Sequence, residues 1–458
     1  LALSAALPAS RLAAQELKAT PFSARSSPEG ETLFTKLSAE RTGIATTNRY
    51  GDPRMWNQLH REYHVGAIGT GVAIGDYDGD GRLDVFVVSK VESARLFRNL
   101  GDWRFEDVTE SAGVADDSGS WKQGAAFVDV DNDGALDLYV CRFGAANQLF
   151  MNQGDGTFRD EAAARGLAVV DASGMGNFAD YDHDGWLDVY LQTNLLDATT
   201  SPEGQRDYLF RNNGDGTFRD VTEAAGMSLR PTQGHSATWW DQNDDGWLDL
   251  YVANDFDPPD FLYRNNGDGT FTNVIDTALP HTPFSSMGAD SGDIDNDGDI
   301  DLFVADMAGV TYEFSQRGLV DSRGRMPAGH NLQLDTAIQV HSNALYLNTR
   351  TERSLEAAHL AGLEGTDWTW STRFEDLDSD GRLDLFVTNG MDREHNNFDF
   401  IVSKLKAANA MQRIQITKRS PVLAQANLAY ANRSDLVFEE VGAKWGLDKF
   451  GVSFGAAF

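Results

Sequence analysis

Six short acidic segments contain the residues whose types and spacing are best suited to chemistry. Each follows the pattern Asp-x-Asp/Asn-x-Asp-Gly-x-x-Asp and lies between two apolar runs. Carboxylates crowded in this way repel one another, and a hard divalent cation held by oxygen atoms relieves the repulsion. The pattern therefore predicts six Asp loops that bind Ca²⁺, namely Asp76–Asp84, Asp129–Asp137, Asp180–Asp188, Asp241–Asp249, Asp293–Asp301 and Asp376–Asp384.

The EF-hand is the competing interpretation of such a segment. It requires a helix on each side and a bidentate Glu at the twelfth position. Here the twelfth position is Val87, Val140 or Leu191, inside an apolar run typical of a strand. We therefore exclude EF-hands and expect each Asp loop to connect the two strands of a β-hairpin.

The spacing of the Asp loops indicates the fold that positions them. The first five loops begin 51 to 61 residues apart, and the sixth begins 83 residues after the fifth. The second unit contains four strand-like segments, at residues 124–128, 136–140, 148–152 and 157–160. Four strands in a repeat of about fifty residues are typical of a propeller blade. We predict an all-β fold, a seven-bladed β-propeller of four-stranded blades.

Two segments near the chain ends belong to the expected seventh blade. Residues 451–458 repeat the pattern of a first strand, and residues 31–37 resemble an outer strand. Six Asp loops are present, so we expect a seventh blade that is truncated in this sequence and that the outer strand completes. The expected domains are residues 1–30, a residual signal peptide and linker, and residues 31–458, the propeller.

A second Asp-containing motif, Gly-Asp-Gly, recurs between the third and fourth strands. It lies within residues 153–156, 212–218 and 265–271. Gly and Asn supply the positive φ angles that tight hairpins require, so we interpret these segments as structural turns and not as a second set of metal sites.

Composition limits the partners and the compartment. The formal net charge of −32 argues against nucleic acid and anionic lipid surfaces, which need clustered Lys and Arg. Cys141 is the only cysteine, which excludes an intramolecular disulfide, and we expect it to be a small buried residue. Residues 1–14 resemble the apolar part of a secretory signal, with a disordered leader as the alternative. No apolar run has the length of a membrane-spanning helix, and we expect a secreted, periplasmic or cell-surface protein.

The Asp loops and turns together resemble the FG-GAP/VCBS repeats of the integrin α-subunit β-propeller. Residues 212–218, 220–227 and 252–256 are similar to the cartilage-acidic-protein-like group, whose members often end in an ASPIC/UnbV domain. The resemblance covers about residues 31–458 and implies that such a domain lies beyond Phe458.

In that family the metal ligands are the side chains at loop positions one, three, five and nine and the carbonyl at position seven. Asn243 replaces a carboxylate and should weaken the fourth site, and Asp299 would offer only its carbonyl. The ligands that the resemblance implies are Asp76, Asp78, Asp80, Arg82, Asp84, Asp129, Asp131, Asp133, Ala135, Asp137, Asp180, Asp182, Asp184, Trp186, Asp188, Asp241, Asn243, Asp245, Trp247, Asp249, Asp293, Asp295, Asp297, Asp299, Asp301, Asp376, Asp378, Asp380, Arg382 and Asp384.

Long loops on a rigid scaffold are where binding sites usually lie. The fifth unit inserts residues 305–341 and the sixth inserts residues 388–426 after their second strands, at the blade end opposite the Asp loops. We place the candidate binding surface on that face, and strand-end capping is the alternative role for each polar residue there. These residues are Asn194, Asn254, Asp255, Asp306 and Asn389.

Other candidate groups have plainer alternatives. Residues 393–395, Arg-Glu-His, offer an acid/base group or a solvated loop, and residues 400–416 after them have the spacing of an amphipathic helix. His60 and His64 have the spacing of a zinc pair on a helix but lack the Glu of His-Glu-x-x-His. His183, at a non-ligand loop position, should face solvent.

Aromatic pairs precede two Asp loops, at Trp239-Trp240 and at Trp368-Thr369-Trp370. Blade-to-blade packing is the default role of such residues, and sugar stacking is the alternative.

These features favour an exported Ca²⁺-binding propeller that acts as a binding or adhesion module for protein or glycan. One alternative is an enzyme acting on a polysaccharide or lipid, which would need a His, an Arg and a carboxylate converging in a pocket on the insertion face. The other is a structural scaffold for the C-terminal domain. No residue pattern assigns catalysis.

Overall fold

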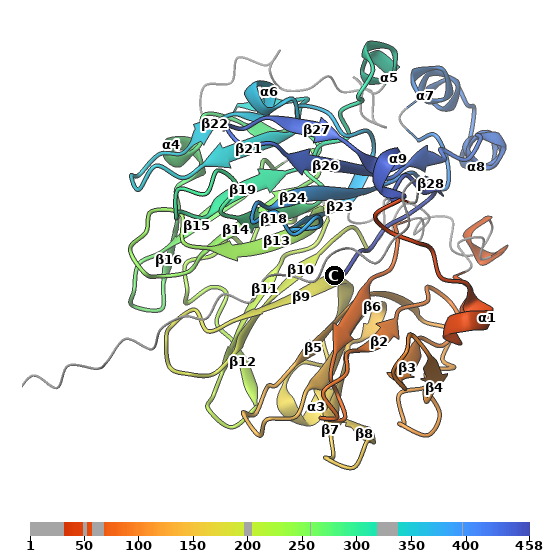
Figure 1. The fold of residues 1–458 in the computed structure, drawn as a ribbon, viewed down its shortest axis with the longest axis vertical. Helices are drawn as coiled ribbons and strands as arrows, with labels where there is room; N and C mark the ends of the chain where they lie inside the picture. The colour runs from red at the N-terminus through yellow and green to blue at the C-terminus, as the bar shows by residue number, and fades with distance from the viewer. Residues whose placement is uncertain are drawn as a thin grey trace, which may run out of the picture.

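The structure is a computed structural model that describes residues 32–48, 53–56, 68–196, 204–256, 258–317, 338–395 and 397–458. These residues form six successive four-stranded antiparallel units arranged around a common centre, near which the C-terminus lies (Figure 1). Each unit pairs its strands in chain order, so each is a propeller blade. The predicted all-β propeller of four-stranded blades is confirmed.

The first three blades contain twelve strands in chain order. Blade 1 consists of β1 (Val72–Gly75), β2 (Asp84–Val87), β3 (Arg95–Asn99) and β4 (Phe105–Asp107). Blade 2 consists of β5 (Trp121–Val128), β6 (Asp137–Ala146), β7 (Gln148–Asn152) and β8 (Phe158–Asp160). Blade 3 consists of β9 (Val170–Ala179), β10 (Asp188–Thr193), β11 (Tyr208–Asn212) and β12 (Phe218–Asp220).

The other three blades repeat this order with longer connections. Blade 4 consists of β13 (Gly234–Trp240), β14 (Asp249–Asn254), β15 (Phe261–Asn265) and β16 (Phe271–Asn273). Blade 5 consists of β18 (Ala289–Gly292), β19 (Asp301–Val304), β21 (Ala344–Leu347) and β22 (Leu355–Glu356). Blade 6 consists of β23 (Thr369–Glu375), β24 (Asp384–Asn389), β26 (Leu428–Asn432) and β27 (Phe438–Glu440).

Short elements connect the blades. Two small sheets pair β17 (Thr282–Pro283) with β20 (Gln339–Val340) and β25 (Gln425–Ala426) with β28 (Phe450–Gly451). The helices are α1 (Ala39–Thr42), η1 (Pro53–Trp56), α3 (Ala162–Arg165), α4 (Ile275–Ala278), α5 (Tyr312–Arg317), α6 (Ala358–Ala361), α7 (Phe398–Leu405), α8 (Ala410–Arg419) and α9 (Gly442–Trp445).

The amphipathic helix expected over residues 400–416 is instead two helices, α7 and α8. The side chain of Asn409 accepts a hydrogen bond from the Gln412 amide and thereby caps the start of α8. A capping Asn satisfies free backbone N–H groups, so it begins a new helix where the apolar spacing alone would continue the old one.

Small residues in the first strands allow neighbouring blades to approach closely. A Cβ atom on Gly75 would lie 2.9 Å from the Leu136 side chain of blade 2, and one on Gly176 would lie 2.9 Å from the ring of Tyr139. Glycine at these positions therefore removes a steric clash between blades.

The hydrophobic core is a series of layers between consecutive blades. Phe86 and Leu96 of blade 1 pack with Leu138 and Phe150 of blade 2, and equivalent apolar clusters join each later pair of blades. Each blade therefore stabilises its neighbours, as expected for a repeat architecture.

Both chain-end segments of the structure lie beside blade 6, at the position expected for a seventh blade. The amide of Phe34 donates to the carbonyl of Trp445, in the turn after blade 6, at 2.8 Å. The Phe158 amide of blade 2 makes the equivalent bond to the Ala112 carbonyl in the turn after blade 1. The Ser453 amide donates to the Asn389 carbonyl of blade 6. Residues 32–37 therefore occupy an outer-strand position, as the sequence predicts.

The expected outer strand does not form a β-ladder. Residue 31 and the predicted leader lie outside the described residues, and among the described ones no third strand lies beside Phe34 to pair with it. On its other side the C-terminal segment meets blade 1, because a Cβ atom on Gly455 would lie 3.2 Å from the Cα of Gly71. The two segments thus lie between blades 6 and 1.

Candidate functional site

The Asp loops occupy the same place in all six blades, between the first and second strands. In each blade the last residue of the first strand pairs with the ninth loop residue. The pairs are Gly75 with Asp84, Val128 with Asp137, Ala179 with Asp188, Trp240 with Asp249, Gly292 with Asp301 and Glu375 with Asp384. The predicted ligand residues are thus brought together in six separate hairpin loops.

The backbone of every loop turns at its fourth and sixth positions. The fourth residue has a left-handed conformation with φ between 55° and 70°, whether it is Gly79, Asn132 or His183. The sixth is always Gly, with φ between 83° and 95°, although in most loops a Cβ there would meet no neighbouring atom. Glycine is required at the sixth position for its conformation and not for space.

The first Asp of each loop organises the turn. Asp76 accepts hydrogen bonds from the amides of Asp80 and Gly81, at 3.1 and 2.8 Å, and the other five loops repeat both bonds at 2.8–3.2 Å. The loop is therefore shaped by its own carboxylate, which holds the other oxygen ligands in place.

The ninth Asp of each loop is a buried carboxylate. Asp84 accepts hydrogen bonds from the amides of Tyr77 and Asn99, at 3.2 and 2.7 Å, and is fully buried, as are its equivalents. Burial raises the pKa of Asp84 to about 6 and that of Asp137 to about 7. A cation beside these groups would favour the charged form and oppose that rise.

Asp188 shows this effect most strongly. Its Oδ1 accepts from the Asn212 amide at 2.8 Å, whereas its Oδ2 is buried without a hydrogen-bond partner. Burial raises its pKa to about 8. A buried carboxylate with an unpaired oxygen is costly unless a positive charge lies beside it.

Several carboxylates converge closely enough to share one ion. In the first, second, third and sixth loops the residues at positions one, three and nine offer oxygens within 4.8 Å of one another, and in the fifth loop those at positions one, three and five do so. Four buried oxygens at position three have no hydrogen-bond partner among the described residues, those of Asp131, Asp182, Asn243 and Asp378. These inward oxygens fit a hard cation.

Arginine side chains lie over some of the same carboxylates. Arg165 is 3.2 Å from Asp131, Arg211 is 2.6 Å from Asp182, and Arg82 pairs with Asp80. These guanidinium groups provide part of the positive charge that the loops need. Arginine also pairs with the Asp at position five in the first, third and sixth loops, through Arg82, Arg211 and Arg382.

Two individual predictions concern residues within the loops. Asp299 turns its side chain to the Arg350 Nε at 2.6 Å, so only its backbone remains available to its own loop, as expected. His183 is exposed, but its ring also stacks on Trp247 of the next loop, with centroids 4.4 Å apart.

Sequence reasoning missed an Asn at the end of each third strand, or directly after it in blade 5. The Nδ2 of Asn152 donates both to the Tyr77 carbonyl in the preceding Asp loop, at 2.8 Å, and to the Leu136 carbonyl in its own loop, at 3.0 Å. Asn212, Asn265 and Asn432 make the same two bonds in their blades. Recurrence of Asn before the Gly-containing turn was the available signal.

On the opposite face, the predicted polar residues cap strand ends. Asn194 donates to the Gly234 carbonyl at 2.7 Å, and Asn389 donates to the Ala426 carbonyl at 3.0 Å. Asp306 accepts from the amides of residues 284 and 285 and pairs with His341 at 2.8 Å. The capping alternative therefore accounts for these side chains.

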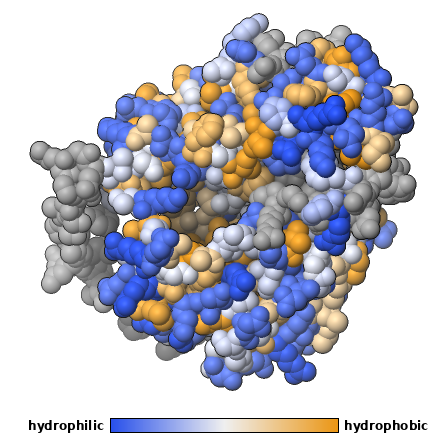
Figure 2. Space-filling view, turned by 90° about the vertical axis from the view of Figure 1, so that its right-hand side faces the viewer, coloured by the Kyte–Doolittle hydropathy of each residue, from blue (hydrophilic) through white to orange (hydrophobic). Residues whose placement is uncertain are grey.

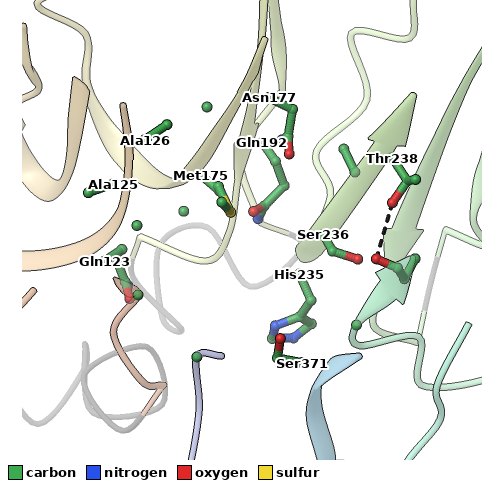
Figure 3. A pocket seen from close by; sticks show the side chains of 18 of the residues that line it. Gln123, Ala125, Ala126, Met175, Asn177, Gln192, His235, Ser236, Thr238 and Ser371 are labelled. Atoms are coloured by element: carbon green, nitrogen blue, oxygen red, sulfur yellow. Dashed lines mark hydrogen bonds between the residues drawn. The ribbon is translucent and has the colours of Figure 1, made fainter. Parts of the chain in front are cut away.

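A cavity of about 840 Å³ runs between the first strands of the blades. Gln123, Met175, Gln192, His235 and Ser371 line it, as Figure 3 shows. His235 lies 3.7 Å from the partly buried carboxylate of Asp255.

An Arg and a carboxylate also line this cavity. Arg373 lies 3.8 Å from Asp290 and donates to the Ala456 carbonyl at 3.2 Å, while Asp290 accepts from the Phe374 amide. His235, Arg373 and Asp290 thus share the cavity, but Arg373 and Asp290 are engaged in contacts between blades.

The remaining candidates are mostly structural. Trp239 donates to the Asn177 carbonyl and stacks on Tyr181 of the neighbouring blade, which favours packing over sugar stacking. His395 is buried and 3.2 Å from Asp392, so it is not part of a solvated loop. Cys141 is fully buried, as expected. His60 and His64 lie outside the described residues.

Comparison with known proteins agrees with this architecture. The FG-GAP-like repeat matches residues 76–140, 129–191, 195–252 and 241–304. The fold and the Asp loops thus define a β-propeller built from FG-GAP-like repeats. Human cartilage acidic protein 1 is 26% identical over 223 residues, which cover 48% of this chain and 33% of that protein. This chain therefore contains FG-GAP-like repeats and is homologous over this region to cartilage acidic protein 1.

The matched region spans about a third of the length of these relatives, including the protein of the same name from Xenopus tropicalis, which is 27% identical over 40% of this chain and 28% of its own. Among solved structures, an Agrocybe aegerita lectin that recognises terminal N-acetylglucosamine aligns with a TM-score of 0.45 and 16% identity, over 86% of this chain and 88% of the lectin. No helix of the described residues is long and apolar enough to cross a membrane.

Proposed function

We propose that this chain is an exported, Ca²⁺-binding β-propeller that acts as a binding or adhesion module for a protein or glycan ligand. The observation that carries the proposal is the shared backbone geometry of six Asp loops at one end of the blades, with the long insertions at the other. The loops would stiffen the scaffold, and the insertions would contact the ligand.

The loop chemistry favours Ca²⁺ over other metals. The side chains that would hold the ion are carboxylates at positions one, three, five and nine, with Asn243 as the one amide, and hard oxygen donors are the preferred ligands of Ca²⁺. Zinc and copper prefer imidazole or thiolate, which the ligand positions do not offer. Bound Ca²⁺ would neutralise the loop carboxylates and so stabilise the folded state.

The insertions suit recognition because they project from a fixed base. In blade 6, Met391 and Leu423 exchange backbone hydrogen bonds of 2.8 and 2.9 Å, which clamp the insertion where it leaves the blade. Helices α7 and α8 lie beyond this clamp. Such loops can vary in sequence without disturbing the blades that carry them.

A glycan array and a protein pull-down with Ca²⁺-loaded protein test the binding proposal. We expect a ligand whose binding is lost when residues 398–419 are replaced by a short Gly-Ser linker. Replacement of the Gly-Asp-Gly turn at residues 154–156 provides the matched control on the opposite face. A ligand that binds equally well after removal of residues 398–419 would contradict the placement of the site.

Export supplies a separate test. The Ala- and Leu-rich leader, residues 1–14, favours secretion, and Ca²⁺ loops of modest affinity fill where free Ca²⁺ is high. Expression with the leader should yield protein outside the cytoplasm, cleaved before about residue 31. Retention of the intact leader in the cytoplasm would contradict export.

The cavity gives an enzymatic alternative one specific basis. His235 lines the cavity beside Asp255, an arrangement in which a carboxylate can orient an imidazole. If this pair acts as a base, His235→Gln should abolish turnover of a polysaccharide substrate while leaving Ca²⁺ binding unchanged. If no turnover of candidate substrates occurs with the native chain, the binding proposal is favoured.

A further inference from the structure

The helical hairpin formed by α7 and α8, residues 398–419, is a basic element on an acidic chain. It contains five Lys and Arg residues and a single carboxylate, Asp399, whereas the whole chain has a net charge of −32. The cations of the hairpin are Lys404, Lys406, Arg413, Lys418 and Arg419. The net charge of the whole chain argues against anionic lipid surfaces, but a charge of opposite sign concentrated in one element creates a local field that favours an anionic partner.

Helix α7 exposes an apolar stripe next to these cations. Phe398, Val402 and Leu405 are four and three residues apart, so they share one side of the helix. Phe398 is 48% exposed and Leu405 60%, whereas Ile401, which flanks the stripe on the side toward the protein, is fully buried. Met411, near the start of α8, is 59% exposed. Phe398 and Leu405 of the stripe are therefore exposed, while Val402 between them is half-buried.

Four of the five cations of the hairpin are exposed to a partner, whereas Lys404 is half-buried. Lys406, Arg413 and Arg419 are exposed, and none of them forms an ion pair with another described residue. Lys418 lies 5.7 Å from the ring of Trp56, above which Arg393 also lies. Binding an anion at these groups would break no salt bridge among the residues that the structure describes.

The hairpin also stands apart from the acidic loops. It leaves blade 6 after β24, whose six residues span roughly 20 Å from the sixth Asp loop. Figure 1 places α7 and α8 at the upper right edge of the molecule, and the view from the right-hand side shows hydrophobic residues interspersed with strongly hydrophilic ones (Figure 2). The hairpin can therefore meet a surface while the Asp loops point away from it.

We propose that the α7–α8 hairpin docks the protein onto a bilayer that contains anionic phospholipid. The apolar stripe would enter the boundary between headgroups and acyl chains, and the cations would lie against lipid phosphates. A soluble acidic polysaccharide would also attract the cations, but it would leave Leu405 and Met411 in water. This inference goes beyond the proposed function and does not depend on it, since the hairpin carries its own charge and apolar surface.

Vesicle sedimentation in millimolar Ca²⁺ tests the proposal with the full chain. The protein should bind vesicles of phosphatidylcholine with phosphatidylglycerol and not vesicles of phosphatidylcholine alone. The triple variant Arg413→Gln, Lys418→Gln, Arg419→Gln should bind roughly 100-fold more weakly, because each juxtamembrane cation contributes about 1 kcal/mol. The matched control removes three exposed Arg residues elsewhere, Arg104, Arg159 and Arg230, and should retain binding.

A second pair of variants separates apolar insertion from charge alone. Phe398→Ser with Leu405→Ser should also weaken vesicle binding by at least tenfold, whereas Val170→Ser with Leu360→Ser, at least as exposed but on other blades, should not. Thermal melts verify that each variant folds.

Three results would overturn the proposal. The first is equal binding to both kinds of vesicle, and the second is binding that persists in the triple cation variant, which would assign it to Ca²⁺ bridges at the Asp loops. The third is a native chain that binds no vesicles but captures a soluble acidic polysaccharide, heparin or alginate. In that case the triple cation variant would lose the polysaccharide, whereas the Phe398 and Leu405 variant would keep it.

Discussion

Replacing Asn265 by Ala should destabilise the propeller more than the same change at Asn99. The Nδ2 of Asn265 donates to the Tyr181 carbonyl of the preceding Asp loop at 2.8 Å and to the Leu248 carbonyl of its own loop at 3.2 Å. Its Oδ1 accepts from the Gly267 amide at 3.0 Å. Asn265 is 3% exposed, so water cannot replace these bonds.

The magnitude follows from the groups left unpaired. Two carbonyls near the buried Asn265 would each lose a donor, at about 1–3 kcal/mol apiece, so we expect a loss of about 3 kcal/mol in the free energy of unfolding. At Asn99 the Nδ2 donates only to the exposed Leu83 carbonyl, at 2.8 Å. Water can replace that bond, and the expected loss is about 1 kcal/mol.

Urea denaturation followed by tryptophan fluorescence compares the two variants, with Ca²⁺ held at millimolar concentration. We expect the Asn265→Ala midpoint to lie clearly below that of Asn99→Ala. Equal losses of unfolding free energy in the two variants would refute the reasoning. Of these two residues, Asn265 alone donates a hydrogen bond to the preceding Asp loop.

Three further predictions follow from the described contacts. Asp133→Ala should bind one Ca²⁺ fewer by elemental analysis, whereas Asp155→Ala, in a turn, should bind as much as the native chain; equal losses would mean that the turns also bind metal. Burial raises the pKa of Asp260 to about 7, so its protonation stabilises the native state and the free energy of unfolding should fall as pH rises from about 4 to 7. Asp260→Asn should flatten that slope in urea titrations, and an unchanged slope would place the effect elsewhere. Trp445→Ala should lower the melting temperature more than Trp103→Ala, because Trp445 is buried beside residues 32–37 and Trp103 is 65% exposed; equal shifts would contradict packing at the seventh-blade position.

The sequence allowed the Asp loops and the blade order to be predicted because both depend on local constraints. The sixth position of each loop needs a positive φ, which selects Gly, and the ninth Asp begins the second strand. Each requirement acts within nine residues and recurs in every repeat. The number of strands in a blade follows from the same repetition.

Contacts between blades could not be predicted in this way. Asn152 and Tyr77 are 75 residues apart, and their bond depends on how two blades pack. The burial of His395 likewise depends on Trp368, whose ring centroid lies 6.4 Å away, and not on its polar neighbours in sequence. The break between α7 and α8 depends on the hydrogen bond that the Asn409 side chain accepts from the Gln412 amide. This cap interrupts an apolar spacing that continues through both helices.

Calcium stoichiometry tests the central claim most directly. After equilibrium dialysis at millimolar free Ca²⁺, elemental analysis of the native chain should find about six ions per molecule, one for each Asp loop, with the Asn243 loop the first to empty as free Ca²⁺ is lowered. A chain that retains its fold and binds no Ca²⁺ under these conditions would contradict the assignment of the Asp loops as metal sites.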